Sequence, residues 1–133
     1  MTKPEKLTPA EWEIMDVIWK LGGLQSVRQV IEHAYPDGEK AYTTVQTIMN
    51  ILVKKGVLVS EKIGLVNYYR PVKVRGQVVD AELSNMARRI FQGSIPAMTN
   101  YLINMKDLSR DEIQAIKSVL AEKEDTKKEK DND

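Results

Sequence analysis

The sequence contains no cysteine and a single histidine among its 133 residues. Without cysteine the chain cannot form disulfides, thiolate zinc sites, iron–sulfur clusters or a cysteine nucleophile, and one histidine cannot make a two-histidine metal site. His33, the one candidate for a base at neutral pH, lies near the end of a predicted helix, where a surface or partly buried position is expected. We therefore predict that the protein is not an enzyme and uses no metal and no cofactor.

Long apolar runs and an excess of one charge are missing as well. No segment approaches the roughly 20 apolar residues that span a membrane, and no apolar segment follows the first residues, so we expect no anchor, no signal peptide and a cytoplasmic location. Lysine and arginine number 20 against 19 acidic residues, a net charge of +1. Composition therefore gives no support to nucleic-acid binding, and function has to be inferred from where residues lie.

Helix signals are frequent in the first half of the chain. Thr8 opens a capping box that predicts a helix over about residues 9–21, and Ser26 opens another that predicts a short helix over about residues 26–34. A third helix, over about residues 42–55, carries apolar residues at positions i, i+3, i+4 and i+7. The apolar side of this third helix consists of Val45, Ile48, Met49 and Leu52.

The hydrophobic period changes after the third helix. Residues 57–62 and 67–72 are rich in β-branched and aromatic residues, and Gly64 lies between the two segments, which predicts a β-hairpin. Three helices followed by a hairpin is the order of elements in a winged helix-turn-helix. The predicted fold is therefore mainly α-helical with a small β-hairpin, and residues 1–73 form a winged helix-turn-helix domain.

The remainder of the chain has helical periodicity. It predicts helices over about residues 75–91 and 95–105, and a last helix that begins at a capping box on Ser109 and runs to about Lys123. Residues 124–133 contain no apolar residue and eight charges, which predicts a disordered tail.

Residues 74–123 are predicted to form a helical dimerisation domain. Three short helices are too few to bury so much apolar surface alone, and a second copy of the same segment is the simplest partner. The alternative is that these helices fold back on the first domain and extend its core. The side chains expected at the dimer interface are Leu83, Ile90, Phe91, Tyr101, Leu102, Ile113, Ile116 and Leu120.

The third helix has an unusual polar side. Thr43, Thr47, Asn50 and Lys54 lie opposite its apolar side at 100° per residue, and no acidic residue occurs between Ala41 and Ser60. Hydroxyls and amides can bond to base edges in a major groove, and acidic groups would repel phosphate. The alternative is an ordinary solvated helix face, although such faces usually carry Glu and Lys four residues apart.

These features predict a set of DNA contacts. Gln46, Thr47 and Asn50 are expected to read bases, while hydroxyls and cations position the phosphate backbone. The full set is Arg28, Tyr42, Thr43, Thr44, Gln46, Thr47, Asn50, Lys54 and Lys62, with Lys55 as a further candidate for a backbone contact. A protein-interaction function for the same face, without specific DNA binding, is the alternative.

Several segments together resemble the BlaI/MecI penicillinase-repressor family of bacterial regulators. The resemblance spans about residues 7–123. The segments that carry it are LTPAEWEIM at 7–15, IW at 18–19, YTTVQTIMNILVKKG at 42–56, YRP at 69–71, FQGS at 91–94 and DLS at 107–109.

The resemblance implies a dimeric repressor that binds inverted-repeat operators through a winged-helix domain. It also implies control by a membrane-bound metalloprotease sensor, with repression ending when the dimerisation domain is cut. Family members are cut at an Asn-Phe bond, whose nearest counterpart here is Asn100-Tyr101; the alternative is that Tyr101 is only a core aromatic residue.

Three departures from the family pattern stand out. Ile51 occupies a position where arginine is common, and the apolar residues 63–66 replace a hairpin tip that often carries arginine or lysine. We therefore expect few DNA contacts from the tip. The absence of cysteine excludes the Cys-x-Cys pattern through which one branch of the family senses copper.

Overall fold

The computed structural model describes residues 6–131. The chain divides into two compact units, Met1–Met86 and Ala87–Asp133, with the boundary inside one helix. The boundary expected from the sequence lies between residues 73 and 74. We describe each unit by itself.

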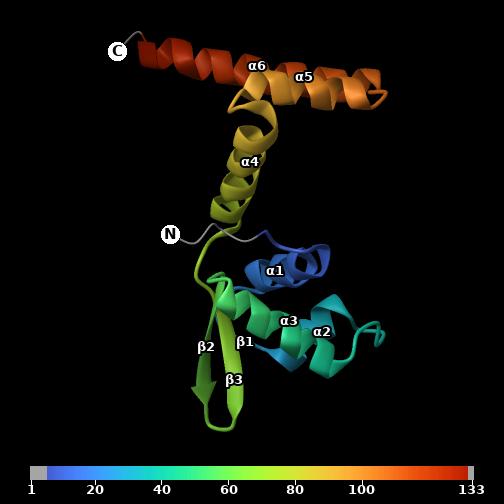
Figure 1. Cartoon of the computed structure of the whole chain (residues 1–133), viewed down its shortest axis with the longest axis vertical. Coiled ribbons are helices and arrows are strands. Elements are labelled where there is room, and N and C mark those ends of the chain that lie inside the picture. Colours follow the sequence, from blue (N-terminus) through green and yellow to red (C-terminus); the bar gives the residue numbers. More distant parts are fainter. Residues whose placement is uncertain (1–5, 132–133) are drawn as a thin grey trace. The chain divides into compact units, whose positions relative to one another are not determined.

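The first unit contains three helices and a three-stranded sheet, followed by the start of a fourth helix (Figure 1). The sheet is antiparallel, with strand order β1-β3-β2. Its elements are α1 (Pro9–Leu21), β1 (Gln25–Ser26), α2 (Val27–Ala34), α3 (Tyr42–Lys54), β2 (Leu58–Ile63) and β3 (Val66–Pro71), and the fourth helix is α4 (Arg75–Phe91). This is the order of a winged helix-turn-helix, so the predicted fold class is confirmed.

The predicted helix starts are confirmed at atomic detail. In α1 the Thr8 hydroxyl accepts from the backbone N–H of Glu11 at 3.2 Å, and the Glu11 carboxylate accepts from the backbone N–H of Thr8 at 3.1 Å. Ser26 and Gln29 form the same reciprocal pair at the start of α2. Each pair satisfies N–H groups that the first helical turn leaves without a partner.

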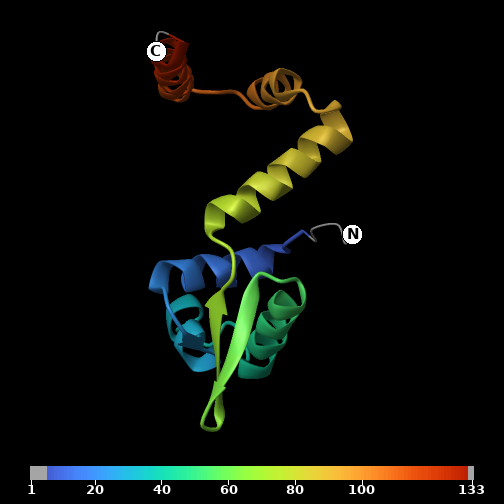
Figure 2. The same ribbon diagram turned by 90° about the vertical axis from the view of Figure 1, so that its left-hand side faces the viewer.

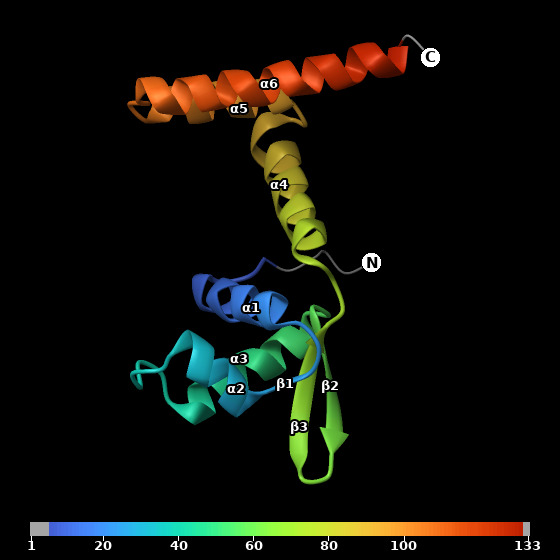
Figure 3. The same ribbon diagram turned by 180° about the vertical axis from the view of Figure 1, so that it is seen from behind.

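The core of the first unit lies where the three helices meet the sheet. α3 packs against α1, α2 and β2, and Figure 3 shows α2 and α3 side by side. The predicted apolar side of α3 faces inward, with Val45, Met49 and Leu52 fully buried and Ile48 partly buried. The opposite side of α3 is thereby held outward.

The short strand β1 was not predicted. Gln25 and Ser26 pair with Tyr69 and Tyr68 of β3, so β3 becomes the central strand of the sheet. Figure 2 shows the β2–β3 hairpin extending past the helices of this unit. The pairing fixes the base of the hairpin on both edges of β3 and leaves only its tip unsupported.

The first turns of α4 belong to the first unit. The Trp19 indole N–H donates to the Lys73 carbonyl at 2.8 Å, and the backbone N–H of Leu7 donates to a Glu82 carboxylate oxygen at 2.9 Å. Val78 is buried in the core of this unit. Val78 and Glu82 are four residues apart and therefore share a face of α4. Because the start of α4 docks here, the first unit extends beyond the boundary expected between residues 73 and 74.

The second unit contains the end of α4, followed by α5 (Ile95–Met105) and α6 (Arg110–Asp131). The Ser94 hydroxyl accepts from the backbone N–H of Ala97 at the start of α5. At the start of α6, Ser109 and Glu112 form the predicted capping box. The backbone N–H of Ser109 is the main reason why the pKa of Glu112 is lowered.

The last helix is longer than the sequence indicated. α6 continues to Asp131, so residues 124–131, predicted to be disordered, are helical, while residues 132–133 of the predicted tail lie outside the described residues. Glu and Lys are good helix formers, and Glu124 and Lys128 are spaced to attract each other on one helix face. The charged composition of this segment indicated disorder, but the segment directly continues a helix that has already formed.

Candidate nucleic-acid interface

The outer side of α3 is an exposed polar face. Its predicted residues Thr43, Thr47, Asn50 and Lys54 are all exposed, as are Tyr42 and Thr44 at its start, and Gln46 is half-buried on one edge. Ile51 is exposed beside them. The structure thus brings the predicted α3 contacts together on one surface, which we call the α3 face.

The hairpin extends the α3 face. Ser60 lies opposite Tyr69, and Lys62 lies opposite Asn67, in the antiparallel pairing of β2 with β3. Directly opposite residues project from the same side of a sheet, and residues two apart on one strand share that side. Because Tyr69 points into the core, Lys62 and Asn67 lie on the side of the sheet that α3 covers. Lys62, one of the predicted DNA contacts, therefore lies on the same side of the sheet as the α3 face.

A hydrogen bond connects the α3 face to the sheet. The Tyr69 hydroxyl donates to the Asn50 side-chain oxygen at 2.8 Å, and the Tyr69 residue has no exposed surface. Burial is the largest cause that raises the pKa of Tyr69 above its ordinary value of 10.0, followed by the neighbouring Tyr42. The hydroxyl therefore stays protonated and remains a donor at neutral pH. Sequence reasoning missed Tyr69, although its position on the core side of β3 follows from the alternation of the strand.

A second internal bond lies along α3. The Thr47 hydroxyl donates to the Thr43 carbonyl at 2.8 Å. Its proton is used inside the helix, so Thr47 presents acceptor lone pairs outward. Unlike α1 and α2, α3 begins without a side-chain cap, which leaves its first N–H groups with no side-chain acceptor.

Lys55 is not part of the α3 face, and the prediction that it contacts the DNA backbone is wrong. Its ammonium lies 2.6 and 2.8 Å from the two carboxylate oxygens of Glu11 and donates to the Lys6 carbonyl at 2.8 Å. Glu11 itself is 3% exposed. The three donors of the ammonium group are thus used inside the fold. No local pattern indicates this pair, because its members are far apart along the chain.

Arg28 and the hairpin tip lie outside the α3 face. Arg28 is exposed on α2, the helix that packs against α3. At the tip, Leu65 is 95% exposed between the exposed Ile63 and Val66. The apolar tip carries no charge that could bind phosphate, and the small number of DNA contacts expected there stays a prediction.

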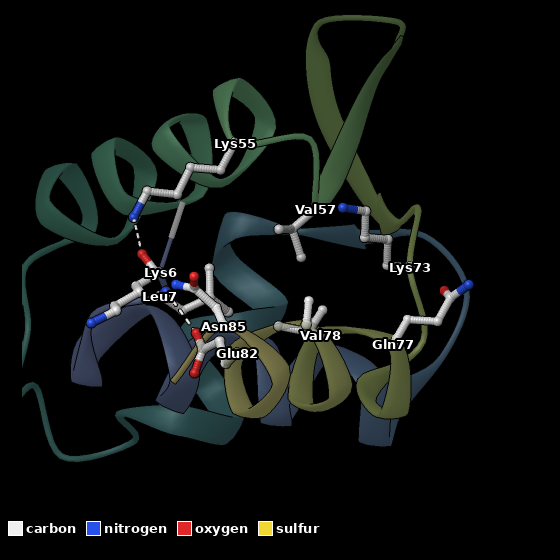
Figure 4. Close-up of a pocket in the computed structure, with 10 residues that line it drawn as sticks. Lys6, Leu7, Lys55, Val57, Lys73, Gln77, Val78, Glu82 and Asn85 are labelled. Atoms are coloured by element: carbon white, nitrogen blue, oxygen red, sulfur yellow. Dashed lines mark hydrogen bonds between the residues drawn. The ribbon is translucent and has the colours of Figure 1, made fainter. Parts of the chain in front are cut away.

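A small cavity lies in the first unit, outside the residues of the α3 face. It is lined by residues before α1, by Lys55 and Val57, and by the first turns of α4, with a volume of about 40 Å³ (Figure 4). Cofactor pockets are typically about 300–1,000 Å³, so the cavity is too small for one.

Within residues 6–131, no three His, Asp or Glu side chains are grouped as metal ligands. None of the helices described is both long enough and apolar enough to span a bilayer.

The residues predicted at the dimer interface are mostly uncovered. Leu83 is exposed on the part of α4 that belongs to the first unit. In the second unit, the exposed members are Ile90, Tyr101, Leu102, Ile113 and Leu120, and the partly buried ones are Phe91 and Ile116. No residue of α6 is buried.

The predicted cleavage bond lies inside α5. Asn100 and Tyr101 are both exposed, and the Tyr101 ring packs against Phe91 with 6.0 Å between ring centres. The Asn104 amide donates to the Asn100 carbonyl and to its side-chain oxygen. Tyr101 therefore makes an aromatic contact but is not a buried core residue.

Proteins of known function are similar to this chain over most of its length. The penicillinase repressor family model matches residues 7–122. The penicillinase repressor of Bacillus licheniformis is 29% identical over 129 residues, which cover 97% of this chain and 100% of that protein. The transcriptional regulator BlaI of Mycobacterium tuberculosis is 30% identical over 125 residues, which cover 93% of this chain and 89% of that protein. The solution structure of monomeric Bacillus licheniformis BlaI in complex with the blaP half-operator is similar over 57% of this chain and 92% of that chain, with 33% identity and a TM-score of 0.47.

Proposed function

Because the chain belongs to the penicillinase repressor family, which consists of transcriptional repressors and not of enzymes, we propose that it represses transcription as a dimer bound to operator DNA. The observation that carries the proposal is the α3 face, which is polar, free of acidic residues and continuous with Lys62 on the hairpin. An α-helix fits into a major groove, so each protomer would insert α3 there.

The roles of the α3 residues follow from their chemistry and exposure. Gln46, Thr47 and Asn50 present amides and a hydroxyl acceptor and would read base edges. Thr43, Thr44, Tyr42, Lys54 and Lys62 would hold phosphates, together with Arg28 on α2. Phosphate contacts fix the orientation of the helix in the groove, while base contacts select the sequence.

Dimerisation would come from the second unit. An amphipathic helix is stable when another surface covers its apolar side, and on α6 that side is formed by Ile113, Ile116 and Leu120. A second copy of this chain would cover it in a two-fold symmetric arrangement. Two linked DNA-binding units bind an inverted repeat far more tightly than either does alone.

Relief of repression is proposed to follow cleavage at Asn100-Tyr101 by a membrane-bound metalloprotease sensor. Cleavage there would separate α6 from the rest of the chain and remove the apolar side that holds the dimer together. Since the bond lies within α5, the helix would have to open locally before a protease could bind it in an extended form. A fragment that begins at Tyr101, identified by mass spectrometry from cells exposed to the inducing signal, would support this route; an intact chain during induction would contradict it.

A gel-shift titration on promoter fragments near the gene tests DNA binding. A shift that weakens as salt rises supports the proposal, since phosphate contacts release counterions. The absence of any salt-sensitive shift would favour a protein-interaction function for the α3 face.

Light scattering tests the dimer. Leu120→Glu places a charge on the apolar side of α6 and should give a monomer. Ser118→Glu adds the same charge on the opposite side of the same helix, where the residue is exposed, and should remain a dimer. A dimer in the first variant would contradict an interface on α6.

A further inference from the structure

The Asn50 side chain is held in one orientation by the sheet. Its amide oxygen accepts the hydroxyl proton of Tyr69 at 2.8 Å, although Asn50 itself is exposed on the α3 face. A free asparagine amide can turn over and offer either its oxygen or its NH₂ group to a partner. Tyr69 takes one of the two oxygen lone pairs and neither of the two N–H donors, so the NH₂ group keeps its full capacity for a ligand while the oxygen keeps only half of its own.

The anchor of this hydrogen bond is rigid. Tyr69 is completely buried on the central strand, where it pairs with Gln25 of β1 on one side and with Ser60 of β2 on the other. Its raised pKa, caused mainly by burial, keeps the hydroxyl protonated well above neutral pH. The donor thus has a fixed position and a fixed protonation state, so the bond can orient Asn50 before any ligand arrives.

The orientation of the amide limits what Asn50 can read. Asparagine commonly pairs with adenine by accepting from its amino group and donating to its N7 atom. Because Tyr69 occupies one oxygen lone pair and fixes where the NH₂ group lies, donation is the larger part of what Asn50 can offer, which favours an edge that presents only acceptors. In the major groove that edge belongs to guanine, through O6 and N7.

We propose that Tyr69 sets the base preference at the one base pair that Asn50 reads, without touching DNA, by fixing Asn50 as a donor to guanine. The inference rests on the proposed function, because it requires α3 to lie in a major groove. Tyr69 is a positioning residue, and Asn50 makes the contact.

The experiment uses the full chain and starts from random DNA, so the operator sequence need not be known. Selection from a random-sequence duplex library gives the preferred site, and each base pair of that site is then replaced in turn while affinity is measured by fluorescence anisotropy. The profile is recorded for the wild type, Tyr69→Phe, Asn50→Ala and the double variant. Tyr68→Phe is the matched control, since Tyr68 is the next residue on β3 and projects from the opposite side of the sheet.

Asn50→Ala should remove the preference for guanine at one base pair of each half-site, a loss between about fivefold and about 150-fold. Tyr69→Phe should lose most of the same preference at the same base pair and leave the others unchanged. It should add nothing in the double variant, because both changes act through one contact. Tyr68→Phe should keep the wild-type profile.

Asn50→Asp provides a second test that does not disturb Tyr69. Aspartate can still accept from the Tyr69 hydroxyl, but it presents only acceptors to DNA, so the preference should change from guanine to cytosine, whose amino group is a donor. Circular dichroism melting of every variant identifies those that have lost their fold.

The results separate this inference from the proposed function. If the wild type selects no sequence, the proposed function fails. If it selects a sequence but Tyr69→Phe leaves the Asn50-dependent preference intact, or lowers affinity equally for all sequences, the positioning role of Tyr69 is wrong while the DNA-binding function stands. An Asn50-dependent preference for adenine would also overturn it.

Discussion

Lys54 and Lys55 are neighbours in the sequence, yet replacing each of them by alanine should have opposite consequences. Lys54 is exposed on the α3 face, whereas the Lys55 ammonium lies 2.6 Å from a carboxylate oxygen of Glu11. The first change should weaken DNA binding and leave the fold intact. The second should weaken the fold and leave the electrostatics of DNA binding intact.

For Lys54→Ala the expected effect is on salt dependence. The slope of log K against log salt concentration is negative, and each phosphate contact makes it steeper by about 0.9. A dimer that loses one contact in each half-site should therefore have a slope that is shallower by about 1.8. A solvent-exposed substitution of this kind usually changes the free energy of unfolding by less than about 0.5 kcal/mol. Lys54→Ala should thus melt at nearly the wild-type temperature.

For Lys55→Ala the expected effect is on stability. The change leaves Glu11, which is 3% exposed, without its cation. Removing one partner of a buried ion pair costs about 3–5 kcal/mol. Each kcal/mol shifts the melting temperature of a 60–100-residue domain by about 4–8 °C, so a decrease of roughly 12 °C or more is expected. The slope of the salt dependence should equal that of the wild type.

Anisotropy titrations between about 50 and 200 mM salt measure the slope, and circular dichroism melting measures stability. Asp16→Ala is the control, because Asp16 belongs to an ion pair on the surface: its Oδ1 atom lies 2.9 Å from Nε of Arg75, and about half of each side chain is exposed. This substitution should lower the free energy of unfolding by no more than about 1 kcal/mol. A reduced salt slope in Lys55→Ala, or a melting temperature equal to that of the wild type, would refute the assignment of Lys55 to the interior.

Three further outcomes are expected. Leu65→Lys places a charge at the uncharged hairpin tip. In the same titrations it should make the dependence of log K on log salt concentration steeper by about 0.9 per half-site and leave the melting temperature unchanged. A chain that ends at Met86 should unfold cooperatively in urea, whereas one that ends at Lys73 should be markedly less stable because it lacks the first turns of α4. The raised pKa of Tyr69 means that the unfolded chain loses this proton at a lower pH than the folded chain, so the contribution of Tyr69 to stability is fully present well below about pH 10 and is lost as the pH rises further. The stability of Tyr69→Phe should therefore fall less steeply with pH in the alkaline range, and Tyr35, whose pKa is raised mainly by burial, should account for part of the slope that remains.

Sequence reasoning was most accurate where the cause of structure is local. α1 covers Pro9–Leu21, as predicted, because a capping box determines its start and Gly22 its end. The outward side of α3 was predicted for the same reason, since helical periodicity alone separates Thr47 and Asn50 from Val45 and Met49.

Contacts between distant parts of the chain were not predictable in this way. β1 contains two residues and exists only because β3 lies beside it. The partners of Lys55 and of Tyr69 are 44 and 19 residues away, respectively. A periodic pattern states which side of an element is apolar, but not which atom of another element it meets. For this reason the residue types of the α3 face were predictable from the sequence. The ion pair that holds Lys55 inside the fold and the hydrogen bond that orients Asn50 were not.

The near-neutral charge of the chain becomes compatible with DNA binding once the acidic residues are located. Residues 1–73 contain ten basic and eight acidic residues, and none of the acidic ones lies on α3. Glu11 is buried against Lys55, and Glu61 projects from the side of the hairpin opposite to Lys62, because neighbouring residues on a strand alternate.

The α3 face therefore carries no acidic residue on the helix itself, so phosphate bound there in the proposed complex would meet no carboxylate of α3. At physiological salt concentration, screening weakens the repulsion between phosphate and acidic groups on other elements beyond about 8–10 Å. The face nevertheless has few cations, so a single half-site should bind weakly and affinity should depend on both protomers acting together. A change on α6 that separates the protomers should then release DNA as completely as a change on α3 itself, while leaving every DNA-contacting residue in place.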